Sequence, residues 1–190
     1  MTGAAAQPRI PPLPAGEWDE VATDILAGRV PGGRQGATSN FMTTLAHDSS
    51  LMQLVISNVR RLLLSSSLPE RDRELVVLRT TWLCGAPYAW AEHVRMAHEA
   101  GVDTAAVDRV TVGPSAPGWD GFERALLRAV DQLHFDAVID DEVWLALAGR
   151  YDQRQLLELP MLAGLYHQLS WTQNAAGIAP NDGSDGLAAR

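Results

Sequence analysis

Apolar residues recur at helical spacing along nearly the whole sequence, and this feature constrains the fold more than any other. One set follows the pattern i, i+3, i+4, i+7, i+8 and consists of Trp18, Val21, Ala22, Ile25 and Leu26. Similar sets run from Leu51 to Leu63 and from Phe122 to Leu133. No stretch alternates with the period of two that a half-buried strand needs. The sequence therefore predicts an all-α, single-domain fold of roughly seven or eight helices.

Two consecutive helices are predicted in the middle of the chain. Ser67 and Glu70 have the spacing of a capping box, which predicts the start of a helix that runs to about Leu83. Pro87 suits the first turn of a second helix, and Gly101 suits its end. The short turn between these helices predicts antiparallel neighbours.

A loop and a long last helix are predicted in the chain after these two helices. Residues 102–117, which contain two prolines, are expected to form a loop. Asp152 with Gln155 predicts a capping box for the last helix. Pro160 is expected to kink or break that helix because proline lacks an amide hydrogen.

The chain divides into three parts by composition. Residues 1–16 are rich in proline and alanine and are expected to form an extended arm. Residues 17–180 carry the helical pattern and form the predicted domain, with a glycine-rich loop at 29–38. Residues 181–190 are expected to be a flexible tail.

Charge and cysteine content exclude several classes of function. The 190 residues include 15 basic residues, all arginine, and 23 acidic residues, for a net charge of −8. Lysine-based catalysis is therefore excluded, and nucleic acid or an anionic membrane is a poor partner. One cysteine permits no internal disulfide. Without a signal peptide or a membrane-spanning run, we expect a cytoplasmic protein, and the arginine- and alanine-rich composition suits a bacterial one.

Glu74 and His93 are the candidate catalytic residues. They lie on the two predicted hairpin helices at similar distances from the turn at Gly85, so their side chains could meet. An imidazole beside a carboxylate is suited to general acid–base chemistry. Spacing alone favours the alternative of a solvent-facing glutamate and a structural histidine.

Other residues of the hairpin are candidates for binding a substrate. Trp82 and Trp90 could wall a pocket for a flat substrate, and Tyr88 adds a hydroxyl, although the spacing also fits core or interface residues. Cys84 is included among the substrate-binding candidates. Its place at a helix C-terminus does not lower a thiol pKa, which favours a small buried residue instead.

The histidines show no metal-ligand spacing along the sequence, and no metal is predicted. His134 and His167 are expected at helix ends or at an interface.

The hairpin resembles the carboxymuconolactone decarboxylase family, which includes the AhpD-type alkylhydroperoxidases. The peroxidases carry a Glu-x11-Cys-x2-Cys-x3-His motif. Aligned without a gap, its glutamate falls on Glu74 and its histidine on His93, whereas its cysteines fall on Ala86 and Ala89. The similarity covers mainly residues 67–101. Disulfide exchange needs two thiols, so a peroxidase of this type is not expected. The Glu74 and His93 frame, with Tyr88 and Trp90 between them, looks more like the decarboxylase branch.

The resemblance implies an AhpD-like helical bundle that forms trimers or hexamers with the site near the interface. It also implies a cofactor-free decarboxylation of an unsaturated cyclic acid, a small-molecule substrate. His93 would then donate a proton, Glu74 would orient it or act as base, and Tyr88 would bind the oxyanion. The candidate arginines for the substrate carboxylate are Arg34, Arg71, Arg79 and Arg95. A related isomerase or hydratase, a non-catalytic ligand-binding oligomer and a peroxidase using Cys84 are the alternatives.

Overall fold

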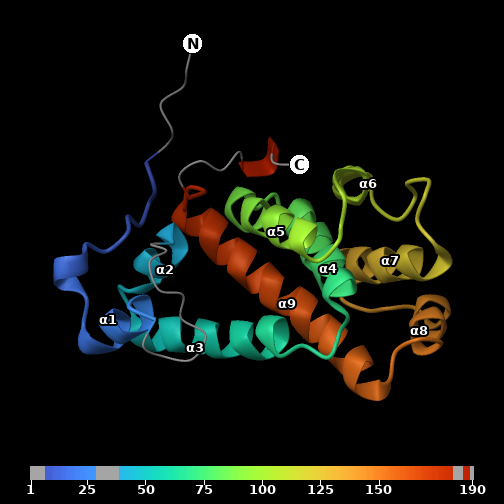
Figure 1. Ribbon diagram of the computed structural model, residues 1–190, viewed down its shortest axis with the longest axis horizontal. Coiled ribbons are helices and arrows are strands. Elements are labelled where there is room, and N and C mark those ends of the chain that lie inside the picture. The colour runs from blue at the N-terminus through green and yellow to red at the C-terminus, as the bar shows by residue number, and fades with distance from the viewer. Residues whose placement is uncertain (1–6, 29–38, 182–185, 189–190) are drawn as a thin grey trace, which may run out of the picture.

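The structure is a computed structural model that describes residues 7–28, 39–181 and 186–188. The described residues contain helices and no strand, which confirms the all-α prediction (Figure 1). The α-helices in them are α1 (Glu20–Leu26), α2 (Asn40–Leu45), α3 (Ser49–Val59), α4 (Glu70–Leu83), α5 (Pro87–Glu99), α6 (Thr104–Val112), α7 (Gly121–Phe135), α8 (Asp141–Ala148) and α9 (Gln153–Ala176). A π-helical turn, Arg60–Leu64, extends α3.

Helix α4 forms the centre of the core. It packs against α5, α6, α7 and α9, and the side chains of Leu75, Val76, Val77 and Leu78 are fully buried. A helix that is apolar on all sides cannot lie at the surface. The middle of α4, from Glu74 to Thr81, is buried on every side, which explains why four consecutive apolar residues interrupt the amphipathic pattern.

Helix α9 lies between two groups of helices (Figure 1). On one side are α4 and α5, and on the other is α3 with its π-helical turn. A second, smaller apolar cluster joins α1, α2 and α3 through Ala22, Ile25, Ala46 and Met52. The cavity described below lies between α3, α5 and α9.

Helix α6 corrects the expected loop at residues 102–117. The Asp103 side chain accepts a hydrogen bond from the Ala106 amide at 2.7 Å and caps the helix. Val107 and Val110 are buried against the core. The two prolines that suggested a loop follow the helix, which ends at Gly113 with a φ of 98°.

The expected capping box at Ser67 is also wrong, because α4 begins after Pro69 without a side-chain cap. The Ser67 hydroxyl instead donates to Glu158 Oε2 at 2.6 Å, and its amide donates to Glu158 Oε1 at 3.0 Å. A contact with α9 therefore replaces the local cap.

Helix α9 confirms its expected capping box and excludes a break at Pro160. The capping box of Asp152 and Gln155 is present. Pro160 does not break the helix, which continues to Ala176. Pro160 is the eighth residue of the helix, where a missing amide hydrogen removes a single backbone hydrogen bond and the neighbouring packing sustains the helix.

The described part of the N-terminal arm is extended along the chain's own surface. The Arg9 amide donates to the Ala176 carbonyl at 2.8 Å, and the Leu13 amide donates to the Thr43 carbonyl at 2.9 Å. Residues 1–6, the glycine-rich loop at 29–38 and most of the expected tail at 181–190 lie outside the described residues. No described helix combines the length and apolar character required to cross a bilayer.

Candidate active site

The side chains of Glu74 and His93 meet inside the helical hairpin. Gly85, with a φ of 56°, supports the turn that brings α4 and α5 together. His93 Nδ1 lies 2.7 Å from Glu74 Oε2, and both side chains are buried. Arg73 Nε donates to the other carboxylate oxygen at 3.2 Å. The two residues singled out as acid–base candidates are thus brought together.

Electrostatics favour an ionised Glu74. Burial would raise the pKa of Glu74, but the hydrogen bonds and charges of His93 and Arg73 outweigh burial and lower it. Because an ionised carboxylate only accepts hydrogen bonds, His93 Nδ1 must donate to it. The Nε2 atom, which has no hydrogen-bond partner in the described part of the chain, is then the nitrogen available to a ligand.

Tyr166 on α9 packs against the imidazole of His93. Its ring packs edge-on against His93, with centroids 4.8 Å apart and an interplanar angle of 88°. Burial raises the pKa of Tyr166, with Glu74 contributing in the same direction, so its hydroxyl is neutral. The His93 ring is therefore fixed by a carboxylate and an aromatic neighbour.

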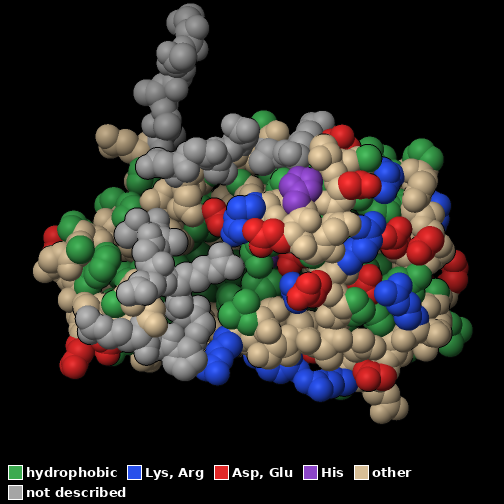
Figure 2. Space-filling view, viewed as in Figure 1, with side chains coloured by type: hydrophobic (Ala, Val, Ile, Leu, Met, Phe, Trp, Pro, Cys, Tyr) green, Lys and Arg blue, Asp and Glu red, His purple; other side chains and the backbone are tan. Residues whose placement is uncertain are grey.

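His93 lines a cavity of about 290 Å³ between α3, α5 and α9. Figure 2 shows hydrophobic side chains gathered between α3 and α5, with acidic and basic side chains around them. The apolar lining includes Ile25, Leu26, Phe41, Met42, Val55, Ile56, Val59, Leu63, Leu64, Ala89, Met96 and Leu169. Glu74 does not line the cavity and acts on it only through His93.

Tyr88 is a polar group of the cavity wall, as the sequence suggested. Its hydroxyl lies 2.5 Å from Ser39 Oγ and accepts from Asn181 Nδ2 at 3.3 Å. Burial raises the pKa of Tyr88, so the hydroxyl is available as a neutral hydrogen-bonding group. Ser39 and Asn181 also line the cavity.

Gln173 is a polar group that the sequence analysis missed. It lines the cavity, is almost completely buried, and its Oε1 has no hydrogen-bond partner among the described residues. A buried acceptor without a partner is unfavourable unless a ligand supplies a donor. Gln173 lies seven residues after Tyr166 on α9, so the two side chains share one face of the helix. This spacing was the signal in the sequence that could have pointed to Gln173.

Two of the candidate arginines have structural contacts. Arg71 pairs with Glu123 at 2.9 Å and donates to the Gly101 carbonyl. Arg79 forms a two-pronged contact with Asp131 and donates to carbonyls at the end of α6. Neither lines the cavity.

Two other arginines do line the cavity. Arg95 lines it and pairs with Glu99 at 2.7 Å. Arg60, which the sequence analysis did not single out, also lines it and makes no side-chain ion pair with the described residues. Arg34 lies outside the described residues.

The remaining substrate-binding candidates lie outside the cavity lining. Trp90 is fully buried in the core and packs against Trp82, with ring centroids 5.1 Å apart. Cys84 lies at the end of α4, beside His134 and His167. Ala89, where the peroxidase motif has its second cysteine, does line the cavity.

The sequence comparison finds a family-model match over the central part of the chain. Residues 51–132 match the model of the carboxymuconolactone decarboxylase family, which confirms the resemblance over this segment. The segment contains α4 and α5 with Glu74 and His93. No curated protein matches the sequence significantly.

Solved structures confirm an AhpD-like fold. A peroxidase-related protein with an alkylhydroperoxidase AhpD core from Ralstonia eutropha JMP134 matches with a TM-score of 0.75 and 19% identity, over 93% of this chain and 95% of that one. The debrominase Bmp8, in complex with 2,3,4-tribromopyrrole, matches with a TM-score of 0.74 and 15% identity, over 94% and 95%. A peroxidase-related protein from a Silicibacter species matches with a TM-score of 0.72 and 16% identity, over 96% and 94%.

Proposed function

We propose that this chain, whose residues 51–132 match the carboxymuconolactone decarboxylase family, is an acid–base enzyme that decarboxylates a small unsaturated cyclic acid. The observation that carries this proposal is the buried Glu74–His93 pair, 2.7 Å apart, with His93 on the wall of a largely apolar cavity. A histidine with one nitrogen fixed by a carboxylate and the other directed to a substrate is the arrangement that general acid–base catalysis uses.

The proposed reaction needs one proton transfer from the protein. The bond between the carboxylate carbon and the ring breaks, CO₂ leaves, and the electron pair enters a conjugated carbonyl of the substrate. His93 Nε2–H then protonates the resulting dienolate carbon. Glu74 stabilises the charged imidazole before the transfer, and water restores the proton afterwards.

The apolar cavity favours loss of CO₂. A carboxylate in water is stabilised by hydration, and a site with few polar groups weakens that stabilisation before the charge disperses. The Tyr88 hydroxyl is suited to donate to the carbonyl oxygen as negative charge develops on it. Gln173 Oε1 would accept from a hydroxyl or amide hydrogen of the substrate.

The substrate is proposed to be small and anionic. A cavity of about 290 Å³ is at the lower end of ligand-binding pockets, which fits a single ring with short substituents. Arg60 is the proposed partner of the substrate carboxylate because it lines the cavity without an ion pair to the described residues. Arginine binds a carboxylate with two parallel hydrogen bonds.

Thiol chemistry has less support. Cys84, the only cysteine of the chain, does not line the cavity, and burial raises the pKa of its thiol. A reactive thiol needs the opposite shift. A peroxidase or a thiol-dependent dehalogenase would therefore have to act away from the His93 cavity.

A screen of unsaturated cyclic carboxylic acids for CO₂ release tests the function. Candidates include carboxylated unsaturated lactones and hydroxylated benzoic acids. The wild type and Cys84→Ser are expected to release CO₂ at the same rate, and Glu74→Gln is expected to be slower. Loss of activity in Cys84→Ser would support thiol chemistry instead, whereas binding of an acid without turnover would support a ligand-binding protein.

A further inference from the structure

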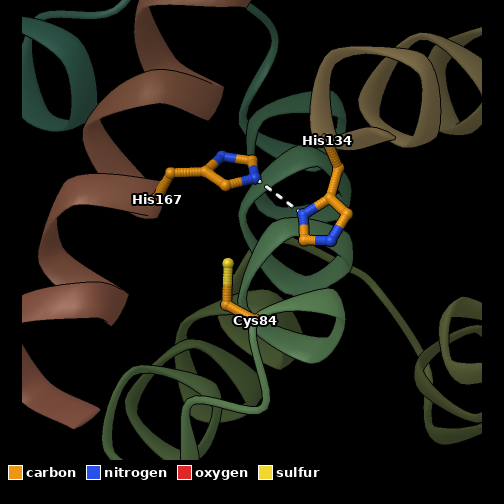
Figure 3. Close-up of side chains that lie close together, drawn as sticks. All are labelled: Cys84, His134 and His167. Atoms are coloured by element: carbon orange, nitrogen blue, oxygen red, sulfur yellow. Dashed lines mark hydrogen bonds between the residues drawn. The ribbon is translucent and has the colours of Figure 1, made fainter. Parts of the chain in front are cut away.

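Three potential metal ligands from distant parts of the sequence converge outside the cavity. Cys84 follows α4, His134 lies in the last turn of α7, and His167 lies in the middle of α9. Figure 3 shows the thiol and both imidazoles directed toward one another. Their ligand atoms, Cys84 Sγ and one ring nitrogen of each histidine, all lie within 4.8 Å of one another.

We propose that Cys84, His134 and His167 form a binding site for Zn²⁺ in which the fourth position is taken by water or an exogenous ligand. One thiolate and two imidazoles form a ligand set that Zn²⁺ favours. Three protein ligands leave one tetrahedral position open.

The distances suit an ion after a small adjustment. His134 Nδ1 lies 2.8 Å from His167 Nε2. Around a tetrahedral Zn²⁺, two nitrogens lie about 3.3 Å apart and a nitrogen and a sulfur about 3.6 Å apart. The imidazoles would separate slightly and the thiol would approach, which side-chain rotation allows. An ion then replaces the hydrogen that the two imidazoles share.

A hydrogen bond to the backbone fixes the tautomer of His167. His167 Nδ1 lies 2.8 Å from the Ala163 carbonyl oxygen and can only donate to it. This bond leaves the lone pair on Nε2, the nitrogen that faces the other two ligands. A second hydrogen bond that orients a ligating imidazole in this way is typical of metal sites.

The surroundings of Cys84 provide a second, independent indication. The hydroxyl of Ser170 is fully buried and lies beside the Cys84 thiol. Its oxygen has no hydrogen-bond partner among the described residues by the usual geometric criteria. A hydroxyl in this position is available to donate to a metal-bound thiolate, which accepts hydrogen bonds better than a thiol does.

Zn²⁺ binding at this site is expected to release one proton. Cys84 loses its thiol proton to solvent, and the His134 proton moves from Nδ1 to Nε2, so that one proton is released for each ion bound. The ion joins α4, α7 and α9, and its binding is expected to raise the melting temperature of the protein. The site is separate from the His93 cavity and does not depend on the proposed decarboxylation.

Cobalt and zinc binding to the full-length, tag-free protein tests the site. Metal-free protein titrated with Co²⁺ is expected to develop the visible bands of tetrahedral cobalt and a near-ultraviolet thiolate-to-cobalt band, saturating at one ion per chain. Calorimetric titration with Zn²⁺ is expected to give the same stoichiometry. Weak octahedral bands without a thiolate band would overturn the proposal.

Variants identify the ligands. Cys84→Ser is expected to lose the thiolate band. His134→Gln is expected to weaken Zn²⁺ binding at least about 100-fold. Loss of a residue that only hydrogen-bonds to a metal ligand costs less than this. His47→Gln, at an exposed histidine outside the cluster, is the control and is expected to bind like the wild type. Wild-type affinity in His134→Gln would contradict the proposal. Because the wild-type cobalt spectrum needs no variant, a folding defect in one variant does not prevent a decision.

Discussion

At the scale of single residues, the account depends on the buried pair of Glu74 and His93. Glu74 is completely buried, and an ionised carboxylate in that position is tolerated only because His93 and Arg73 compensate for the lost hydration. The pair therefore contributes to stability as well as to the proposed chemistry, and each contribution can be measured separately.

The stability contribution of Glu74 is expected to depend on pH in one direction. The fold lowers the pKa of Glu74 below its usual value of 4.5, so ionisation of this carboxyl favours the folded state. Its contribution is fully present above pH 4.5 and is lost as the pH falls through the lowered pKa. Glu74→Gln should cost about 2 kcal/mol at pH 7 and progressively less below pH 4.5.

Urea denaturation of the wild type and Glu74→Gln at several pH values between 3 and 7, at about one-unit steps, measures this difference. A difference that stays constant across the range would show that Glu74 is not a lowered-pKa carboxylate.

Gln173 is expected to affect ligand binding more than stability. Replacement by leucine removes an unpaired buried acceptor, so Gln173→Leu should fold at least as stably as the wild type. KM for the substrate should rise about tenfold if one hydrogen bond is lost. Gln53→Leu, at an exposed position of α3 outside the cavity lining, is the control. An unchanged KM in Gln173→Leu would mean that its carbonyl does not contact the substrate.

The residues of the site differed in how well the sequence predicted them. Glu74, His93 and Tyr88 lie on adjacent helices joined by a short turn, so helical spacing showed that Glu74 and His93 could meet, and the family resemblance then singled out all three. Arg60 reaches the cavity from the turn after α3 and Gln173 reaches it from α9. Helical spacing places each residue on a helix face but does not show which distant element that face packs against. The same reason explains why Cys84, His134 and His167 suggested no metal site.

At the scale of helices, local capping predicted some boundaries and tertiary contacts determined others. The capping box of α9 is local, and it was predicted. The cap of α4 was predicted wrongly, because Ser67 donates to Glu158, 91 residues later in the chain, and does not cap the helix. Helix α6 was missed because the prolines after it outweighed a short apolar pattern.

Asp103 provides the test at this scale. Asp103→Ala removes the side chain that caps α6 and should lower the free energy of unfolding by about 1 kcal/mol. Asp103→Asn retains an oxygen acceptor and should lose only part of this amount. Chemical denaturation compares the variants, and equal stability of Asp103→Ala and the wild type would contradict the capping role.

At the scale of the whole molecule, an exposed apolar stripe follows α9. Leu157, Met161 and Trp171 are at least 63% exposed and share one helix face with Gly164 and Gln168. Large apolar side chains in such a row mark an interaction surface. The stripe supports the proposal that the chain assembles with copies of itself into a trimer or hexamer.

Light scattering coupled to size-exclusion chromatography tests the assembly. The wild type should elute as a trimer or hexamer, and Met161→Glu should shift it toward the monomer because a charge at a buried interface is costly. Val112→Glu alters an exposed apolar residue on α6 and should leave the assembly intact. A monomeric wild type would contradict the proposed oligomer.

The most direct test of the central claim measures turnover and binding side by side in His93→Gln. Glutamine preserves much of the side-chain volume and can still hydrogen-bond to Glu74, but it cannot supply a proton. For an acid that the wild type decarboxylates, kcat should fall by about 10²–10⁴-fold. The dissociation constant, measured by calorimetry, should change by less than about tenfold. Turnover at the wild-type rate in a folded His93→Gln protein would contradict the acid–base role of His93.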